Sequence, residues 1–227
     1  MKKTILTVIS SLLIASVLRA GVDVTTAYTS DYYFRGTQLA QSIIETAVDY
    51  SEGDFYMGVW TAQPFEDAED GSEIENEIDF YGGYGIALSE TAALDIGIAA
   101  YMYPELNDGD EITYEPFIGI AFDTPLAPSF YVYYDLTLES LTLEGSIGHS
   151  FEIDESSSID IGLSVGNVSP DEGDSAMYYL LSAGWGYALA ETASLSIGFN
   201  YTDGDDELVG GNTDDGFYAS IGISVGF

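Results

Sequence analysis

The sequence predicts an all-β protein, a transmembrane antiparallel up-and-down β-barrel of about 12 strands. Three observations lead to this fold class. Apolar residues alternate with small or polar ones from residue 22 to the end of the chain, which is the period of a β-strand. The connections alternate between short turns and longer loops, and the strand-like segments are even in number, as in barrels that cross a membrane.

The strand-like segments follow one another with no helical-period segment between them. In the stretch SIDIGLSVGN, Ile159, Ile161 and Leu163 fall on one face, and Asp160 and Gly162 fall on the other. Short turns such as SEGD follow the even-numbered strands, and acidic or glycine-rich loops such as SPDEGDS follow most odd-numbered ones, except for a short link after the seventh. We expect strands at residues 22–35, 42–51, 55–63, 73–87, 92–103, 111–122, 129–137, 140–152, 158–167, 176–188, 193–202 and 215–227.

A soluble β-sandwich or a lipocalin-like barrel would place its apolar residues inside. Here the residues that alternate with the apolar positions are largely Gly, Ser and Ala, which suit a confined lumen better than a solvent-exposed surface. Aromatic residues also fall near strand ends, where a membrane barrel carries its interfacial girdle. The candidates for this girdle are Trp60, Tyr101, Tyr103, Tyr134, Trp185 and Tyr187.

The first residues have the layout of a secretory signal peptide, with a basic start and an apolar run from Ile5 to Val17 that is too short for a transmembrane helix. We expect a signal peptide at residues 1–20 and a barrel at residues 21–227. The predicted location is the bacterial outer membrane, in contact with lipid and lipopolysaccharide. The last strand ends at Phe227 and resembles the C-terminal signal read by the barrel-assembly machinery, which is an expected partner.

The charge balance is strongly acidic. The chain has four Lys and Arg, of which only Arg35 lies beyond the predicted signal peptide, against 39 Asp and Glu. The predicted mature chain therefore carries a formal charge of about −38, which argues against nucleic acid and anionic lipid surfaces as partners. There is no cysteine, so neither a disulfide nor a thiolate metal site is available.

Acidic residues recur at positions that alternate with the apolar ones. If apolar side chains face lipid, these acids face the lumen or its rim, and Arg35 joins them near one end of the first strand. Rings of carboxylates attract cations and repel anions, so a water-filled lumen of this kind would favour cationic or neutral small solutes. The predicted pore-lining residues are Asp23, Asp31, Arg35, Glu45, Asp49, Glu73, Glu75, Glu77, Asp79, Asp95, Glu115, Asp135, Glu144 and Asp160.

Two features of this interior have alternative explanations. The acidity extends to the loops, so adaptation to a saline habitat explains it as well as solute selectivity does. Twelve strands leave only a narrow channel, and small inward residues such as Gly184 and Gly222 either leave room for it or allow a loop to pack inside. We expect Arg35 to pair with carboxylates, which would hold the first loop against the wall or shape a constriction; the alternative is an arginine at the rim that pairs with nothing in particular.

No enzyme, cofactor or metal site is predicted. The only histidine, His149, has lipid-facing parity, whereas Ser150 points inward, so the two are not arranged as a base and its nucleophile. The acidic runs NDGDE, DEGD and DGDD offer oxygen ligands for calcium or magnesium, but none has the spacing of an EF-hand loop. The segments LSETAALDIG (88–97) and LAETASLSIG (189–198) agree in seven of ten positions, which fits either a duplicated half-barrel or two turns with similar requirements.

One stretch resembles a known family. TSDYYFRGTQLAQSIIETAVDYSEGDFYMGVW, followed by ENEIDFYGGYG, is similar to the TorF-type porin family of proteobacteria over about residues 28–86. The opening motif falls on Ser30, Asp31, Tyr32, Phe34, Arg35 and Gly36.

The resemblance implies an exported outer-membrane barrel that acts as a porin without a catalytic site. Taken with the acidic parity pattern, it favours passive diffusion of small solutes with a preference for cations. The alternative is a closed barrel with a structural or surface-binding role and no conducting lumen.

Overall fold

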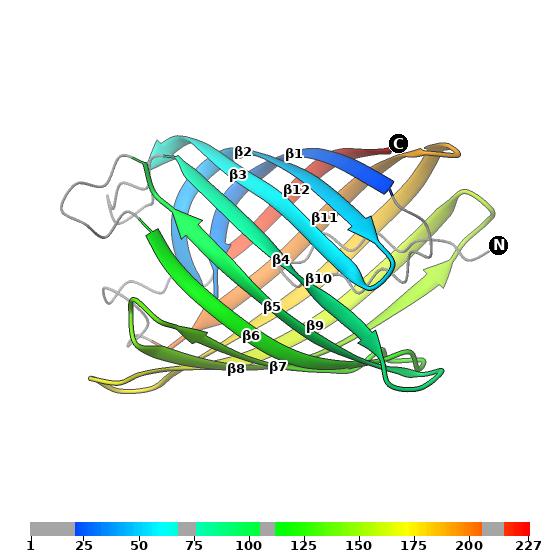
Figure 1. The fold of residues 1–227 in the computed structure, drawn as a ribbon. Helices are drawn as coiled ribbons and strands as arrows, with labels where there is room; N and C mark the ends of the chain where they lie inside the picture. The colour runs from blue at the N-terminus through cyan, green and yellow to red at the C-terminus, as the bar shows by residue number, and fades with distance from the viewer. Residues whose placement is uncertain (1–20, 68–75, 105–111, 206–215) are drawn as a thin grey trace.

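The computed structural model describes residues 21–67, 76–104, 112–205 and 216–227. Twelve strands form one closed barrel in which every strand pairs antiparallel with its neighbours in the sequence, and the first strand closes on the last (Figure 1). The strands are β1 (Gly21–Phe34), β2 (Thr37–Glu52), β3 (Phe55–Asp67), β4 (Glu77–Ala87), β5 (Ala92–Met102), β6 (Ile112–Phe122), β7 (Ser129–Asp135), β8 (Ser140–Glu152), β9 (Ser157–Pro170), β10 (Ala176–Ala190), β11 (Ala193–Gly204) and β12 (Gly216–Gly226). The predicted fold class is confirmed.

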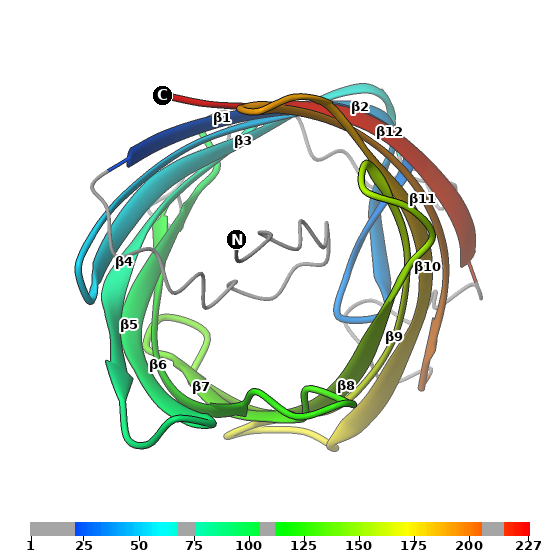
Figure 2. The ribbon, with the colours of Figure 1, turned by 90° about the vertical axis from the view of Figure 1, so that its right-hand side faces the viewer.

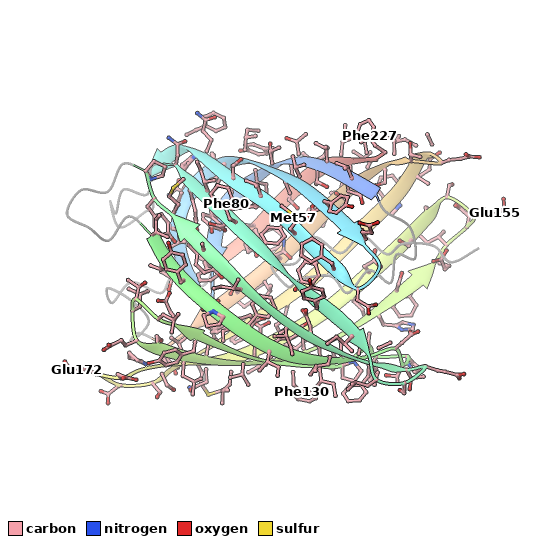
Figure 3. All side chains as sticks on the ribbon, in the orientation of Figure 1. Met57, Phe80, Phe130, Glu155, Glu172 and Phe227 are labelled. Atoms are coloured by element: carbon pink, nitrogen blue, oxygen red, sulfur yellow. The ribbon has the colours of Figure 1, made fainter. Side chains whose placement is uncertain are left out.

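The outer face of the barrel is apolar. Large hydrophobic side chains at alternate strand positions are exposed, among them Met57, Phe80 and Phe130, and Phe130 projects away from the barrel at the lower edge of Figure 3. A continuous apolar exterior of this kind is what lipid requires and is rare on a soluble monomer. In the described part of the chain, no helix is long and apolar enough to cross a membrane.

The inner face is polar and contains the most buried ionisable groups. Glu77, Asp95 and Glu115 are among the largest fully buried side chains of the described residues. This distribution is the reverse of a soluble barrel and agrees with the parity expected from the sequence, because alternate residues of a strand point to opposite faces. The alternation therefore decides which side chains meet across the lumen.

Glycines on the inner face make room for aromatic rings from neighbouring strands. A Cβ at Gly119 would lie 2.3 Å from the ring of Tyr131, and one at Gly58 would lie 2.5 Å from the ring of Tyr81. Each ring thus lies across the glycine next to it, where any larger residue would collide with it. This packing holds the inward tyrosines against the wall.

The two ends of the barrel differ in their connections. Short turns join β2 to β3, β4 to β5, β8 to β9 and β10 to β11, at the end where β1 begins and β12 ends (Figure 1). We call this the turn end and the opposite one the loop end. The first connection at the loop end is much tighter than the sequence suggested: β2 begins at Thr37, and only Arg35 and Gly36 link it to β1, with φ of 49° and 85°.

Candidate functional site

The inner face of β3 to β7 carries an array of carboxylates and aromatic residues, which we call the tyrosine wall. It consists of Tyr56, Glu77, Tyr81, Asp95, Tyr101, Glu115, Tyr131 and Tyr133. Phenolic hydroxyls donate hydrogen bonds to the carboxylates, which satisfies groups that would be costly to leave unpaired.

Asp95 on β5 shows the arrangement most fully. It has no exposed surface and accepts hydrogen bonds from Tyr56 at 2.8 Å and from Tyr131 at 3.1 Å. Glu77 on β4 is held in the same way by Tyr32 at 2.9 Å and Tyr103 at 3.1 Å. Two donors on one carboxylate fix its position and stabilise its charged form.

Three further predicted acids have aromatic or hydroxyl donors. Glu45 on β2 accepts from Thr29 at 2.5 Å and from the indole of Trp60 at 3.2 Å. Tyr81 donates to Asp49. Glu144 on β8 accepts from Tyr178 on β10 at 2.6 Å, which links strands that are not adjacent in the sheet.

The loop end of the β1–β2 hairpin leaves the wall and enters the lumen. β1 pairs with β12 only as far as Thr29, opposite Ser220; beyond that point the backbone N–H of Ala219 donates to the hydroxyl of Ser30 at 3.0 Å. β2 stays paired with β3 as far as Ala40, so residues 30–39 form the inward part. Figure 2 shows blue strand from this hairpin inside the ring.

Arg35 at the hairpin tip contacts the opposite wall. Its Nη1 and Nη2 donate to Oε2 and Oε1 of Glu115 on β6, at 2.6 and 2.9 Å. The guanidinium carbon also lies 4.7 Å from the ring centre of Phe34 and 4.8 Å from that of Tyr133. The expected pairing of Arg35 with a carboxylate is confirmed, and it is bidentate.

The side chains of Arg35 and Glu115 are 16% and 2% exposed, so solvent screens this ion pair weakly. Tyr101 donates a third hydrogen bond to Glu115 at 2.9 Å. The hairpin is also held near its tip, where Tyr33 stacks on Tyr218 of β12 with ring centres 5.4 Å apart. These contacts span the lumen from β12 to β6.

The remaining predicted residues lie nearer the rims of the barrel or are hydrogen-bonded within one hairpin or turn. Asp31 is bonded inside the hairpin by Ser30 at 2.8 Å and Gln38 at 3.2 Å. Asp135 Oδ1 accepts the backbone N–H groups of residues 137 and 138 and so closes the β7–β8 turn.

Three other predicted residues, Asp23, Asp79 and Asp160, lie on β1, β4 and β9. Asp23 is exposed at the turn end, and Asp160 accepts from Ser158 at 3.2 Å. One oxygen of Asp79 and one of Asp160 are buried without a partner among the described residues. Glu73 and Glu75 lie outside the residues that the structure describes.

The inner face of β9 to β12 is different, and we call it the small-residue wall. It consists of Gly162, Ser164, Ser182, Gly184, Ser196, Gly198, Ser220 and Gly222. A Cβ at Gly184 would meet only the backbone oxygen of Ile197, at 3.7 Å, among the described atoms. No bulky side chain of the described part of the chain approaches this point from across the lumen.

Part of the expected aromatic girdle is wrong. Trp60, Tyr101 and Tyr103 point inward, because they donate to lumen carboxylates. These residues lie near strand ends, but they share the parity of the inward acids. The parity rule that identifies the acids therefore also identifies the inward tyrosines, which were not among the predicted pore-lining residues.

Among the described residues, His149 makes no hydrogen bond to a serine that could act as a nucleophile. Its Nδ1 lies 2.5 Å from the backbone oxygen of Pro125, and its ring meets Phe151 edge to face. Among the described residues, no group of three or more His, Asp or Glu is arranged to hold a metal ion.

Comparison with protein-family models assigns the chain to a family. The family model described as "Bacterial protein of unknown function (Gcw_chp)" matches residues 18–208. The chain belongs to this family. No curated protein matches it in sequence.

Solved structures of outer-membrane barrels are similar in fold. The NanC porin has a TM-score of 0.58 at 15% identity, covering 90% of this chain and 98% of that one. The KdgM porin has a TM-score of 0.58 at 8% identity, covering 91% and 99%. An outer membrane channel from Pseudomonas putida F1 has a TM-score of 0.54 at 10% identity, covering 94% and 97%. At these identities the similarity concerns the fold.

Proposed function

We propose that the protein is an outer-membrane porin that allows passive diffusion of small solutes and prefers cations. The observation that carries the proposal is the closed barrel with an apolar exterior and carboxylates on its inner face. Inward carboxylates attract cations and repel anions along a water-filled path. The similarity in fold to porins and to an outer membrane channel supports the same function, and a relation to the TorF-type porins belongs to this proposal.

The proposal includes the targeting of the chain. Residues 1–20 would act as a signal peptide, the barrel would lie in the outer membrane among lipid and lipopolysaccharide, and the last strand would engage the barrel-assembly machinery. Phe227 is exposed at the end of that strand. Deleting Phe227 should lower the amount of folded protein in outer-membrane fractions, and unchanged assembly would remove this partner from the proposal.

The test is single-channel conductance in a planar bilayer under a salt gradient. Discrete steps with a cation-selective reversal potential are expected for the wild-type barrel. In the double variant Glu77→Gln and Glu144→Gln the reversal potential should move toward zero, because the inner face loses negative charge while the amides can still accept hydrogen bonds.

A matched control replaces acids at the two ends of the barrel. Glu155 and Glu172 lie at opposite ends in Figure 3, away from the lumen, so Glu155→Gln and Glu172→Gln should leave the reversal potential nearly unchanged. Equal shifts in both sets of variants would mean that overall charge, as in adaptation to salt, governs permeation. A wild-type pore without cation preference would reject the role of the carboxylates.

A non-conducting structural or surface-binding barrel is the second candidate. The inward hairpin favours it, because Arg35 ties the hairpin tip to the opposite wall. A folded barrel that stays silent both as the wild type and as Arg35→Gly would establish this candidate over the porin. Heat-modifiable migration in gels and a β-type circular dichroism spectrum verify that the silent protein is folded.

A further inference from the structure

The contact around Arg35 has the composition of a cation-binding site. One carboxylate, Glu115, receives both ends of the guanidinium, while the rings of Phe34 and Tyr133 lie within 4.8 Å of its central carbon. Carboxylate forks and aromatic faces are the groups that recognise planar cations. An ammonium group cannot reproduce this contact, because it lacks two parallel donors and a flat face.

The receiving side of the contact belongs to the barrel wall. Glu115 is held by Tyr101, and Tyr133 stacks on Tyr131 with ring centres 5.6 Å apart. Phe117 packs against the same ring at 5.8 Å. These residues come from β5, β6 and β7, so the barrel wall supplies the receiving side, and Tyr101 also meets Phe34 of the hairpin with ring centres 5.8 Å apart.

The occupant comes from an element that has left the wall. The hairpin loses its pairing with β12 after Thr29, and Arg35 lies at its two-residue tip. We propose that Glu115, Tyr101 and Tyr133 form a binding site for planar organic cations of the guanidinium class, and that the Arg35 side chain is its built-in occupant. The inference deepens the proposed function, on which it rests for its role in solute selection.

The built-in occupant sets the affinity for solutes from outside. A tethered group competes at an effective concentration on the order of millimolar or higher. A free guanidinium compound therefore binds the wild-type protein weakly, whereas removal of the Arg35 side chain leaves a buried carboxylate without its cation and a vacant site. Solutes of this class would be exchanged with Arg35 as they pass.

The experiment is isothermal titration of the folded, detergent-solubilised barrel with methylguanidinium chloride at constant ionic strength. Arg35→Gly is the variant of choice, because glycine adopts a φ of 49° without strain and so preserves the turn. It should bind methylguanidinium with one site, about tenfold or more tighter than ethylammonium, which has the same charge but no planar fork. The wild type should show no saturable heat over the same range.

Controls test which residues form the site. Adding Glu115→Gln to Arg35→Gly should abolish the difference between the two cations. If Arg35→Gly does not fold, Arg35→Lys keeps the charge and should bind methylguanidinium more tightly than the wild type does. Equal binding of the two cations, equal binding by the wild type and the variants, or binding that survives Glu115→Gln would each overturn the proposal.

The binding site and the porin function can be rejected independently of each other. Calorimetry requires no ion flow, so selective binding by a barrel that stays silent in bilayers would keep the site and reject the porin. Conduction without selective binding would keep the porin and reject the site.

Discussion

The tyrosine wall and the small-residue wall are built from the same kind of antiparallel strands and differ in the side chains that face the lumen. The repeated segments 88–97 and 189–198 each form a turn followed by the start of a strand, and they place Asp95 and Ser196 at equivalent positions. Asp95 is fully buried between Tyr56 and Tyr131, whereas the hydroxyl of Ser196 donates to the backbone oxygen of Gly222 at 3.4 Å.

The difference shows that alternation along a strand decides the direction of a side chain. The volume of that side chain then decides whether it fills the inner face or leaves space there. Large aromatic residues fill the inner face of β3 to β7 and hold carboxylates between them. Serine and glycine on β9 to β12 leave open space at Gly184, and the inward hairpin crosses from β12 to the tyrosine wall. A hairpin that carries the one arginine of the described residues is stabilised on the acidic side.

The largest expected effect concerns glycine. Gly119→Ala should destabilise the barrel by about 3 kcal/mol, because the new Cβ would lie 2.3 Å from the ring of Tyr131 in a packed cluster. Gly184→Ala on the small-residue wall has a nearest contact of 3.7 Å and should change stability by about 0.5 kcal/mol or less. Reversible urea unfolding in lipid vesicles measures both, and equal losses would erase the distinction between the walls.

The second effect concerns the repeated position. Asp95→Ala should cost about 2 kcal/mol of folding free energy, because it leaves the hydroxyls of Tyr56 and Tyr131 without their acceptor. Ser196→Ala removes one long hydrogen bond and should cost about 0.5 kcal/mol or less. The same unfolding assay compares them, and a larger loss for Ser196→Ala would reverse the assignment of the structural wall.

The third effect concerns access from water. The chain has no cysteine, so single cysteines can be labelled without background. Gly184→Cys should react with a cationic methanethiosulfonate reagent at least about tenfold faster than Thr113→Cys, because exposure controls thiol reactivity and Thr113 is buried on β6. Similar labelling rates would show that the two walls are equally accessible.

The smallest effect lies where the hairpin leaves the wall. Ser30→Ala removes the acceptor for the N–H of Ala219, which should cost about 1 kcal/mol. Ser30→Thr keeps a hydroxyl and should retain most of that stability. Unfolding measured for both variants tests whether the Ser30 contact anchors the base of the hairpin, and identical stabilities would show that it does not.

Much of the fold could be predicted because it depends on local patterns. The order of strands, the short turns and the inward parity of Glu45, Asp95 and Glu115 follow from a period of two. The prediction of the first connection was wrong. Residues 36–41 (GTQLAQ) were expected to link two strands, but residues 37–41 continue β2 as far as a two-residue turn. Positive φ at Arg35, a non-glycine residue, is uncommon and has no reliable sequence signal.

The sequence by itself determined the alternation of two faces along the strands and that a single arginine would meet an excess of acids. Only the tertiary structure decided that Arg35 binds Glu115, which lies 80 positions away, and that tyrosine hydroxyls donate to inward carboxylates such as Asp95 and Glu115. The physical reason is distance along the chain. Alternation is a property of neighbouring residues, whereas a contact across the lumen depends on barrel closure and on the direction in which the hairpin leaves the wall.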